Sequence, residues 1–99
     1  MNMQQLMQQA QKMQRDIAGK KKVIDEMVFE SEISWVKMSF NGKKELVAIN
    51  IKKDQVIEGE DIEMLEDMIK GAHRECMKKI DQETESQLGQ YASAMNGIL

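Results

Sequence analysis

Residues 36–51 read Val-Lys-Met-Ser-Phe-Asn-Gly-Lys-Lys-Glu-Leu-Val-Ala-Ile-Asn-Ile, and this stretch indicates the fold class. On both sides of Asn41-Gly42 the side chains alternate with a period of two, and many of them are β-branched or aromatic, which is typical of β-strands. Asn and Gly both tolerate positive φ, which a type I′ hairpin turn requires at its two central positions. The stretch therefore predicts two antiparallel strands joined by a tight turn at Asn41-Gly42.

A third strand is predicted just before this hairpin. Met27 and Phe29 alternate with Val28 and Glu30, and a weaker turn signal follows at residues 31–34, Ser-Glu-Ile-Ser. Residues 27–52 are therefore expected to form a three-stranded antiparallel meander. Three strands with one apolar face need another element to cover that face.

The segment before the sheet, residues 1–27, predicts a long helix. It contains no Pro and is rich in Gln, Met, Lys and Ala, which favour helices. Its apolar residues recur every seven positions in two interleaved series, interrupted only by Lys20. Such a repeat forms a narrow stripe, which suits either a coiled-coil seam or an amphipathic helix packed on its own domain. The predicted dimer or core seam consists of Met3, Leu6, Ala10, Met13, Ile17 and Ile24.

The length of this helix favours a second long helix as its partner. A helix of about 25 residues is about 37 Å long. A compact domain of this chain length has a radius of gyration near 13 Å and is about 34 Å across. The helix would be at least as long as such a domain is wide. Its apolar stripe therefore requires a second long helix, from the same chain or from a second copy.

The second helix is predicted after a polar connection, residues 53–60. Asp61 is a candidate N-cap, and a stripe of apolar residues at three- and four-residue spacing follows it. The helix is expected over 61–88, and residues 89–99 form a tail that either extends it or frays. The order helix, three strands, helix predicts one α+β domain over residues 1–99, α-β-β-β-α.

Catalysis finds little support in the sequence. His73 and Cys76 lie three residues apart on the second predicted helix, but no third group is evident to orient them, and Cys76 falls on the apolar stripe. These two residues are interpreted as a core thiol beside a surface imidazole. The glycines are isolated, so no phosphate-binding loop is indicated, and one chain lacks the ligands for a zinc site. The sequence predicts no enzyme, no metal site and no cofactor.

The number of cysteines and the length of the apolar runs indicate the cellular compartment. A lone Cys suits a reducing, cytoplasmic compartment. No secretory signal is visible at the N-terminus. The longest apolar run, Leu46 to Ile49, is far below the roughly 20 residues that span a bilayer, so no membrane association is predicted.

The charge is unevenly distributed along the chain. The net charge is −3, but residues 1–29 carry five basic and three acidic groups, whereas residues 61–99 carry four basic and eight acidic groups. Any contact with nucleic acid is therefore expected on the first helix, which also carries six Gln. The candidate groups are Lys12, Arg15, Lys20, Lys21 and Lys22, with Arg74, Lys78 and Lys79 as additional ones. The alternative interpretation of Lys20–Lys22 is a solvated charge run near a helix end.

Three segments, in this order, resemble the YbaB/EbfC family of bacterial nucleoid-associated proteins. They are Gln9-Ala10-Gln11-Lys12-Met13-Gln14 in the first helix, the strand-turn-strand over residues 40–49, and Glu63-Met64-Leu65-Glu66-Asp67-Met68-Ile69 at the start of the second helix. The resemblance implies a tweezer-like homodimer whose projecting helices bind double-stranded DNA with little sequence preference. It also implies a cytoplasmic, nucleoid-associated location and no bound cofactor.

A second hypothesis explains the same helices without DNA. Ten Met are present, many on or near the predicted helix seams, and Met packs adaptably against varied surfaces. The chain would then be a protein–protein interaction adaptor with little or no DNA affinity.

Overall fold

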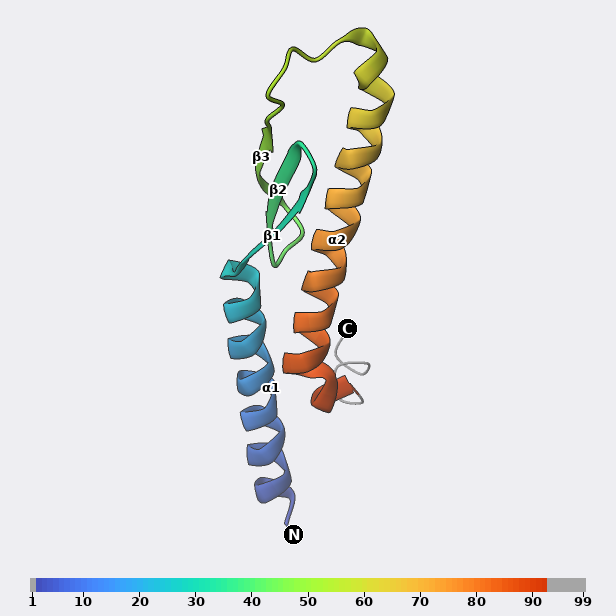
Figure 1. Ribbon diagram of the computed structural model, residues 1–99. Helices are drawn as coiled ribbons and strands as arrows, with labels where there is room; N and C mark the ends of the chain where they lie inside the picture. Colours follow the sequence, from blue (N-terminus) through green and yellow to red (C-terminus); the bar gives the residue numbers. More distant parts are fainter. Residues whose placement is uncertain (1, 93–99) are drawn as a thin grey trace.

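A computed structural model describes residues 2–92 and contains two long helices and one sheet (Figure 1). The elements are α1 (Met3–Glu26), β1 (Val28–Ile33), β2 (Val36–Asn41), β3 (Leu46–Ile51) and α2 (Ile62–Leu88), with 3-10 turns at Gly59–Asp61 and Gly89–Tyr91. The strands pair antiparallel in the order β1-β2-β3. The predicted fold class, α-β-β-β-α, is confirmed.

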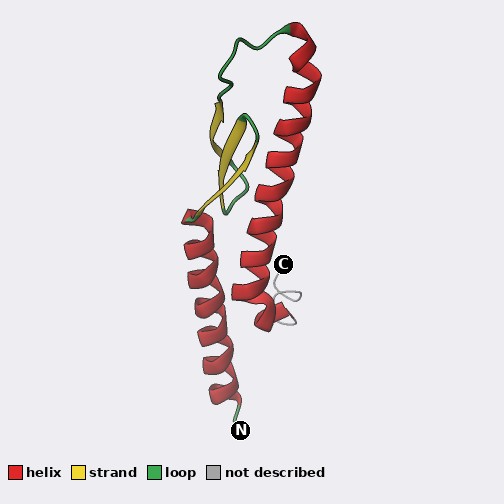
Figure 2. Cartoon of the chain, viewed as in Figure 1, coloured by secondary structure: helices red, strands yellow, loops and turns green. Residues whose placement is uncertain are grey.

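The molecule is long and narrow. Its extents are 70 × 18 × 16 Å, and its radius of gyration is 19.6 Å, well above the roughly 13 Å of a compact domain of this length. The helix α2 runs along the sheet and then beside the second half of α1, and α1 continues past the end of α2 (Figures 1 and 2). The first half of α1 is therefore a projecting arm, which we define as residues 3–16.

The main core lies between α2 and one face of the sheet. Ala72, Cys76 and Ile80 on α2 pack against buried apolar side chains of β1 and β2, namely Phe29, Val36, Met38 and Phe40. This is the cover that the apolar face of the sheet requires. A smaller second core joins the helices, where Ile17 and Ile24 of α1 pack against Leu88, with Tyr91 at its edge.

Polar groups inside the main core are satisfied. The Ser31 hydroxyl donates a hydrogen bond of 2.6 Å to the Ala72 carbonyl oxygen, which ties β1 to α2. The Cys76 Sγ lies 3.3 Å from the Ser31 Oγ and 3.6 Å from the carbonyl oxygens of Phe29 and Met38. The predicted core position of Cys76 is confirmed, since its side chain is fully buried.

The first strand connection is shorter than predicted. The turn signal at residues 31–34 suggested a four-residue turn, but Ser31 and Ile33 belong to β1, and Ile33 pairs with Val36. Only Ser34 and Trp35 form the turn, and Ser34 adopts a positive φ of 51°. The strand is longer because the Ser31 hydroxyl has a partner on α2, so this serine can be buried within a strand.

The prediction of a two-residue type I′ turn at Asn41-Gly42 is wrong. Asn41 ends β2, residues 42–45 form a longer loop, and the positive φ of 69° occurs at Lys44. The Asn41 side-chain oxygen organises this loop by accepting hydrogen bonds from the backbone N–H groups of Lys43 and Glu45. Gly42 is needed because of close approach to α1: a Cβ there would overlap the Ile24 carbonyl group and lie 2.9 Å from the Asp25 Cα.

A polar clasp closes the connection between β3 and α2. The Lys53 ammonium donates to the Asp61 Oδ2 at 2.6 Å and lies 4.7 Å from the centroid of the Trp35 ring. Asp61 also accepts a hydrogen bond from the Glu58 backbone N–H. The Lys53 hydrogen bond, and then the Glu58 N–H, hold the pKa of Asp61 below its usual range. Asp61 precedes α2 as predicted, but its carboxylate is engaged in this clasp and does not cap the first turn of the helix.

The predicted tail is described only in part. Residues 89–91 form a 3-10 turn after α2. Residues 93–99 lie outside the described part of the chain.

Candidate nucleic-acid interface

Four of the predicted basic residues on α1 are solvent-exposed. These are Lys12, Arg15, Lys21 and Lys22. The arm carries Lys12 and Arg15, and no carboxylate occurs in the sequence before Asp16. An exposed helix that carries cations and amides without acids offers a polyanion few repulsive contacts.

Lys20 is placed differently from its two neighbours. It is half-buried, and its ammonium lies 5.5 Å from the centroid of the Tyr91 ring, in the 3-10 turn that follows α2. This position interrupts the apolar stripe, and the cation–π contact accounts for a charge at that site. The structure thus separates Lys20 from the exposed Lys21 and Lys22.

One basic residue near this surface was missed by the sequence reasoning. Lys43, in the loop after β2, lines a shallow hollow together with Lys22 on α1. The same hollow is also lined by Asp25, Glu26, Asn41 and Glu45, so its charges are mixed. The proximity of this loop to the end of α1 depends on Gly42, whose N–H donates to the Asp25 carbonyl oxygen.

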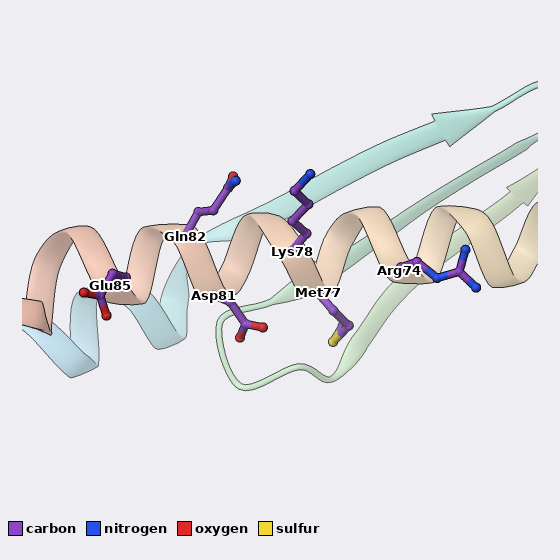
Figure 3. Close-up of a pocket in the computed structure, with 6 residues that line it drawn as sticks. All are labelled: Arg74, Met77, Lys78, Asp81, Gln82 and Glu85. Atoms are coloured by element: carbon purple, nitrogen blue, oxygen red, sulfur yellow. The ribbon is translucent and has the colours of Figure 1, made fainter. Parts of the chain in front are cut away.

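The predicted basic residues on α2 lie among acids. Arg74 and Lys78 line an open hollow on α2 together with Asp81, Glu85, Gln82 and Met77 (Figure 3). Lys78 and Gln82 point to one side of the helix, and Met77 and Asp81 point to the other (Figure 3). The lining of this hollow holds two cations and two carboxylates, so it offers no net positive charge.

Two further lysines act within the fold. Lys79, a predicted DNA contact, donates a hydrogen bond to the Glu30 carbonyl oxygen and so joins α2 to β1. Lys44 forms an ion pair of 3.1 Å with Asp81, which ties the β2–β3 loop to α2. The cations of α2 and of this loop are therefore partly committed to holding elements together.

The predicted seam on α1 divides into two parts. Ile17 and Ile24 are buried against Leu88 within the chain. The other four seam residues are exposed on the arm: Met3, Leu6, Ala10 and Met13. The inner half of the stripe thus packs in the chain's own helix pair, and the outer half has no cover in the described residues.

A second apolar surface is exposed on the sheet, away from the arm (Figure 1). On the outermost strand, β3, the side chains of Leu46, Val47, Ile49 and Ile51 are 40–55% exposed. Further along the chain, Val56, Ile62 and Met64 are exposed as well. Register places Ile49 opposite Met38 and Ile51 opposite Val36, so both belong to the face that α2 covers over β1 and β2. We call this set the β3 surface.

The described residues offer few side chains for catalysis or metal binding. The His73 ring meets Phe40 edge-on with centroids 5.3 Å apart, while Cys76 is fully buried. Among residues 2–92, no group of three or more His, Cys, Asp or Glu could hold a metal ion. Within that same part of the chain, neither long helix has the length and apolar character needed to cross a bilayer.

Comparisons with known proteins agree on one family. A model of the YbaB/EbfC DNA-binding family matches residues 1–95. A protein of Enterococcus faecalis named nucleoid-associated protein is 37% identical, with 98% of this chain and 94% of that protein covered. A protein of the same name from Lachnoclostridium phytofermentans is 39% identical, with 98% of this chain and 76% of that protein covered.

A solved structure shows the same fold. The crystal structure of an uncharacterized Helicobacter pylori protein matches with a TM-score of 0.69 and 21% sequence identity, and the match covers 100% of this chain and 99% of that one. At this identity the likeness concerns the fold alone.

Proposed function

The chain belongs to the YbaB/EbfC DNA-binding family, and on this premise we propose that it is a homodimeric, nucleoid-associated protein that binds double-stranded DNA with low sequence specificity. The contacts are made by basic groups on the projecting α1 helices. Its role is architectural or regulatory, in the cytoplasm, and it involves no catalysis.

The observation that carries this proposal is the separation of charge along the molecule. The exposed cations Lys12, Arg15, Lys21 and Lys22 all lie on α1. A cluster of six acids lies at and just before the start of α2, which is at the opposite end of the molecule from the arm (Figure 1). They are Glu58, Glu60, Asp61, Glu63, Glu66 and Asp67. Binding through the arm, where no carboxylate precedes Asp16, lets phosphates approach its cations while this acidic cluster remains distant, although the net charge is −3.

Low specificity follows from the kind of contact. Lys and Arg on a helix surface bind phosphate oxygens, which are the same at every sequence. Such contacts release counterions, so the affinity falls steeply as the salt concentration rises. With few cations per chain and acids nearby, we expect weak binding.

The β3 surface supports the homodimer. Soluble monomers rarely expose a large contiguous apolar patch. The helix α2 packs over β1 and β2 but leaves the side chains of β3 exposed, so a second copy has an apolar sheet edge to cover. This surface lies toward the end of the molecule away from the arm (Figure 1). A dimer formed there keeps both arms free and doubles the number of cations that one DNA molecule can meet.

Charge reversal on α1 tests the proposal. Binding to a fluorescently labelled, mixed-sequence duplex is measured by anisotropy for the parent and for Lys21→Glu/Lys22→Glu. The matched control is Lys52→Glu/Lys70→Glu, because it changes the net charge equally and both lysines are exposed outside α1. We expect the α1 variant to lose binding while it still forms dimers, and the control to keep most of its affinity. Equal loss in both variants would show that only the overall charge matters and would contradict the assignment to α1.

A further inference from the structure

The projecting arm has two different faces. Its exposed apolar residues continue the stripe that is buried at Ile17 and Ile24. Five polar residues of α1 are separated by four, three, four and seven positions. With 3.6 residues per turn, these separations place all five on one face of the helix, opposite the apolar stripe. They are Gln4, Gln8, Gln11, Arg15 and Lys22, and all are exposed. We call this set the glutamine face.

The remaining glutamines of α1 lie elsewhere. Gln5, Gln9 and Gln14 are also exposed, but their positions fall between the glutamine face and the apolar stripe. The helix thus offers two sets of three glutamines of equal chemistry and different direction. Replacing one set or the other therefore tests whether DNA binding depends on the direction of the glutamine side chains, while the number of glutamines removed stays the same.

We propose that the arm of α1 lies in the major groove of double-stranded DNA, with Gln4, Gln8 and Gln11 at the base edges. Arg15 and Lys22, on the same face, and Lys12 beside it bind the phosphates that border the groove. The inference rests on the proposed function and adds to it a groove, a binding face and a preference for adenine of several-fold to about tenfold, which is modest enough to keep the sequence specificity low.

The dimensions of the arm fit this placement. An α-helix with its side chains is about 10–12 Å across, and the major groove of B-DNA is about 12 Å wide. The seven residue-to-residue steps from Gln4 to Gln11 extend about 10 Å along the helix, which is about three base-pair steps. Among residues 2–92 the arm contributes no buried side chain before Ile17, so its side chains are free of packing contacts with that part of the chain and are accessible to a groove.

The side chains of the glutamine face are suited to hydrogen bonds with base edges, and not only to contacts with phosphates. The Gln amide can accept from adenine N6 and donate to adenine N7 at the same time, which is the pairing expected for Gln in the major groove. Carboxylates would repel the phosphates on both sides, and none occurs before Asp16. The cations are at the inner end of the same face, where the helix leaves the groove.

A modified base tests the inference directly. The protein is titrated against two mixed-sequence duplexes of identical sequence, one with adenine and one with 7-deazaadenine, which lacks the N7 acceptor but keeps Watson–Crick pairing. We expect the parent to bind the adenine duplex several-fold to about tenfold more tightly. The variant Gln4→Ala/Gln8→Ala/Gln11→Ala should bind both duplexes equally and keep the salt dependence of the parent. The control Gln5→Ala/Gln9→Ala/Gln14→Ala should discriminate as the parent does.

The outcomes separate this inference from the proposed function. Ala favours helix at least as well as Gln, so circular dichroism should show that both triple variants keep their helices. Binding by the parent without discrimination overturns the groove placement and leaves the proposed function standing. Discrimination that survives in the first triple variant, or disappears in the control, overturns the assignment to the glutamine face. Absence of binding to either duplex at low salt overturns the proposed function and this inference together.

Discussion

The Lys20 ammonium lies 5.5 Å from the centroid of the Tyr91 ring, where α1 meets the 3-10 turn that follows α2. Lys21 and Lys22, the next two residues, are exposed. One run of three lysines therefore has two roles: the first residue holds two helices together, and the other two are available to a ligand.

The first prediction separates these roles. Lys20→Ala should lower the free energy of unfolding by about 0.5–1 kcal/mol, because a cation–π contact at the helix junction is lost. Lys21→Ala/Lys22→Ala should leave stability nearly unchanged and weaken DNA binding. Thermal unfolding and DNA anisotropy, measured on both variants, check this. If Lys20→Ala weakens DNA binding as much as the double variant does, the division of the run is wrong.

The second prediction concerns the close approach of the β2–β3 loop to α1. A Cβ at position 42 would overlap the Ile24 carbonyl group, so Gly42→Ala should destabilise the protein by about 1–3 kcal/mol, as overpacking typically does. Gly19→Ala is the matched control, since no atom lies within 4 Å of a Cβ there. Within an exposed helix, this control should raise stability by about 1 kcal/mol. Urea denaturation measures both, and similar effects of the two changes would contradict the packing at Gly42.

The third prediction concerns pH. The pKa of Asp61 is lowered in the folded chain, mainly by the Lys53 hydrogen bond, so the folded state binds this proton less readily than the unfolded state. The clasp therefore contributes stability above the unfolded pKa of about 3.9, and this contribution is lost as the pH falls through the lowered value. Asp61→Asn should reduce stability near pH 6 and flatten its decline toward pH 3. Urea midpoints across this range check the prediction, and parallel curves for parent and variant would refute it.

The fourth prediction tests the β3 surface. Ile49→Lys should dissociate the proposed dimer, because it places a charge in the apolar face that a second copy would cover. Asn50→Lys, on the other face of the same strand, should leave the dimer intact. Sedimentation at micromolar concentration is the measurement, and dimer dissociation should also weaken DNA binding through loss of the second arm. If the parent itself sediments only as an 11.4 kDa species, the proposed dimer is wrong.

Much of the fold is visible in the sequence because it depends on local periodicity. The two-residue period around Val36 and Ile49 predicts the strands, and the stripe through Cys76 predicts the buried face of α2. The details that could not be predicted depend on tertiary contacts. Turn propensity at Asn41-Gly42 does not reveal that Gly42 is required by the Ile24 carbonyl group, which is distant in the sequence.

The candidate site, like the fold, could be predicted from the sequence only in part. Charge distribution alone directs attention to α1, but it treats Lys20, Lys21 and Lys22 alike, because the contact with Tyr91 depends on how α2 ends. Similarly, Lys79 is a surface cation in the sequence, whereas its partner, the Glu30 carbonyl oxygen, becomes visible only when β1 and α2 pack together.

The most direct test of the central claim is an equilibrium titration of a mixed-sequence DNA duplex with the unmodified protein at salt concentrations from about 50 to 200 mM. We predict measurable binding at 50 mM salt that weakens as salt rises, with a logarithmic slope shallower than the roughly −5 to −9 expected of a protein that makes six to ten phosphate contacts. Absence of binding at 50 mM salt, with the protein in excess, would contradict DNA binding through the α1 arms.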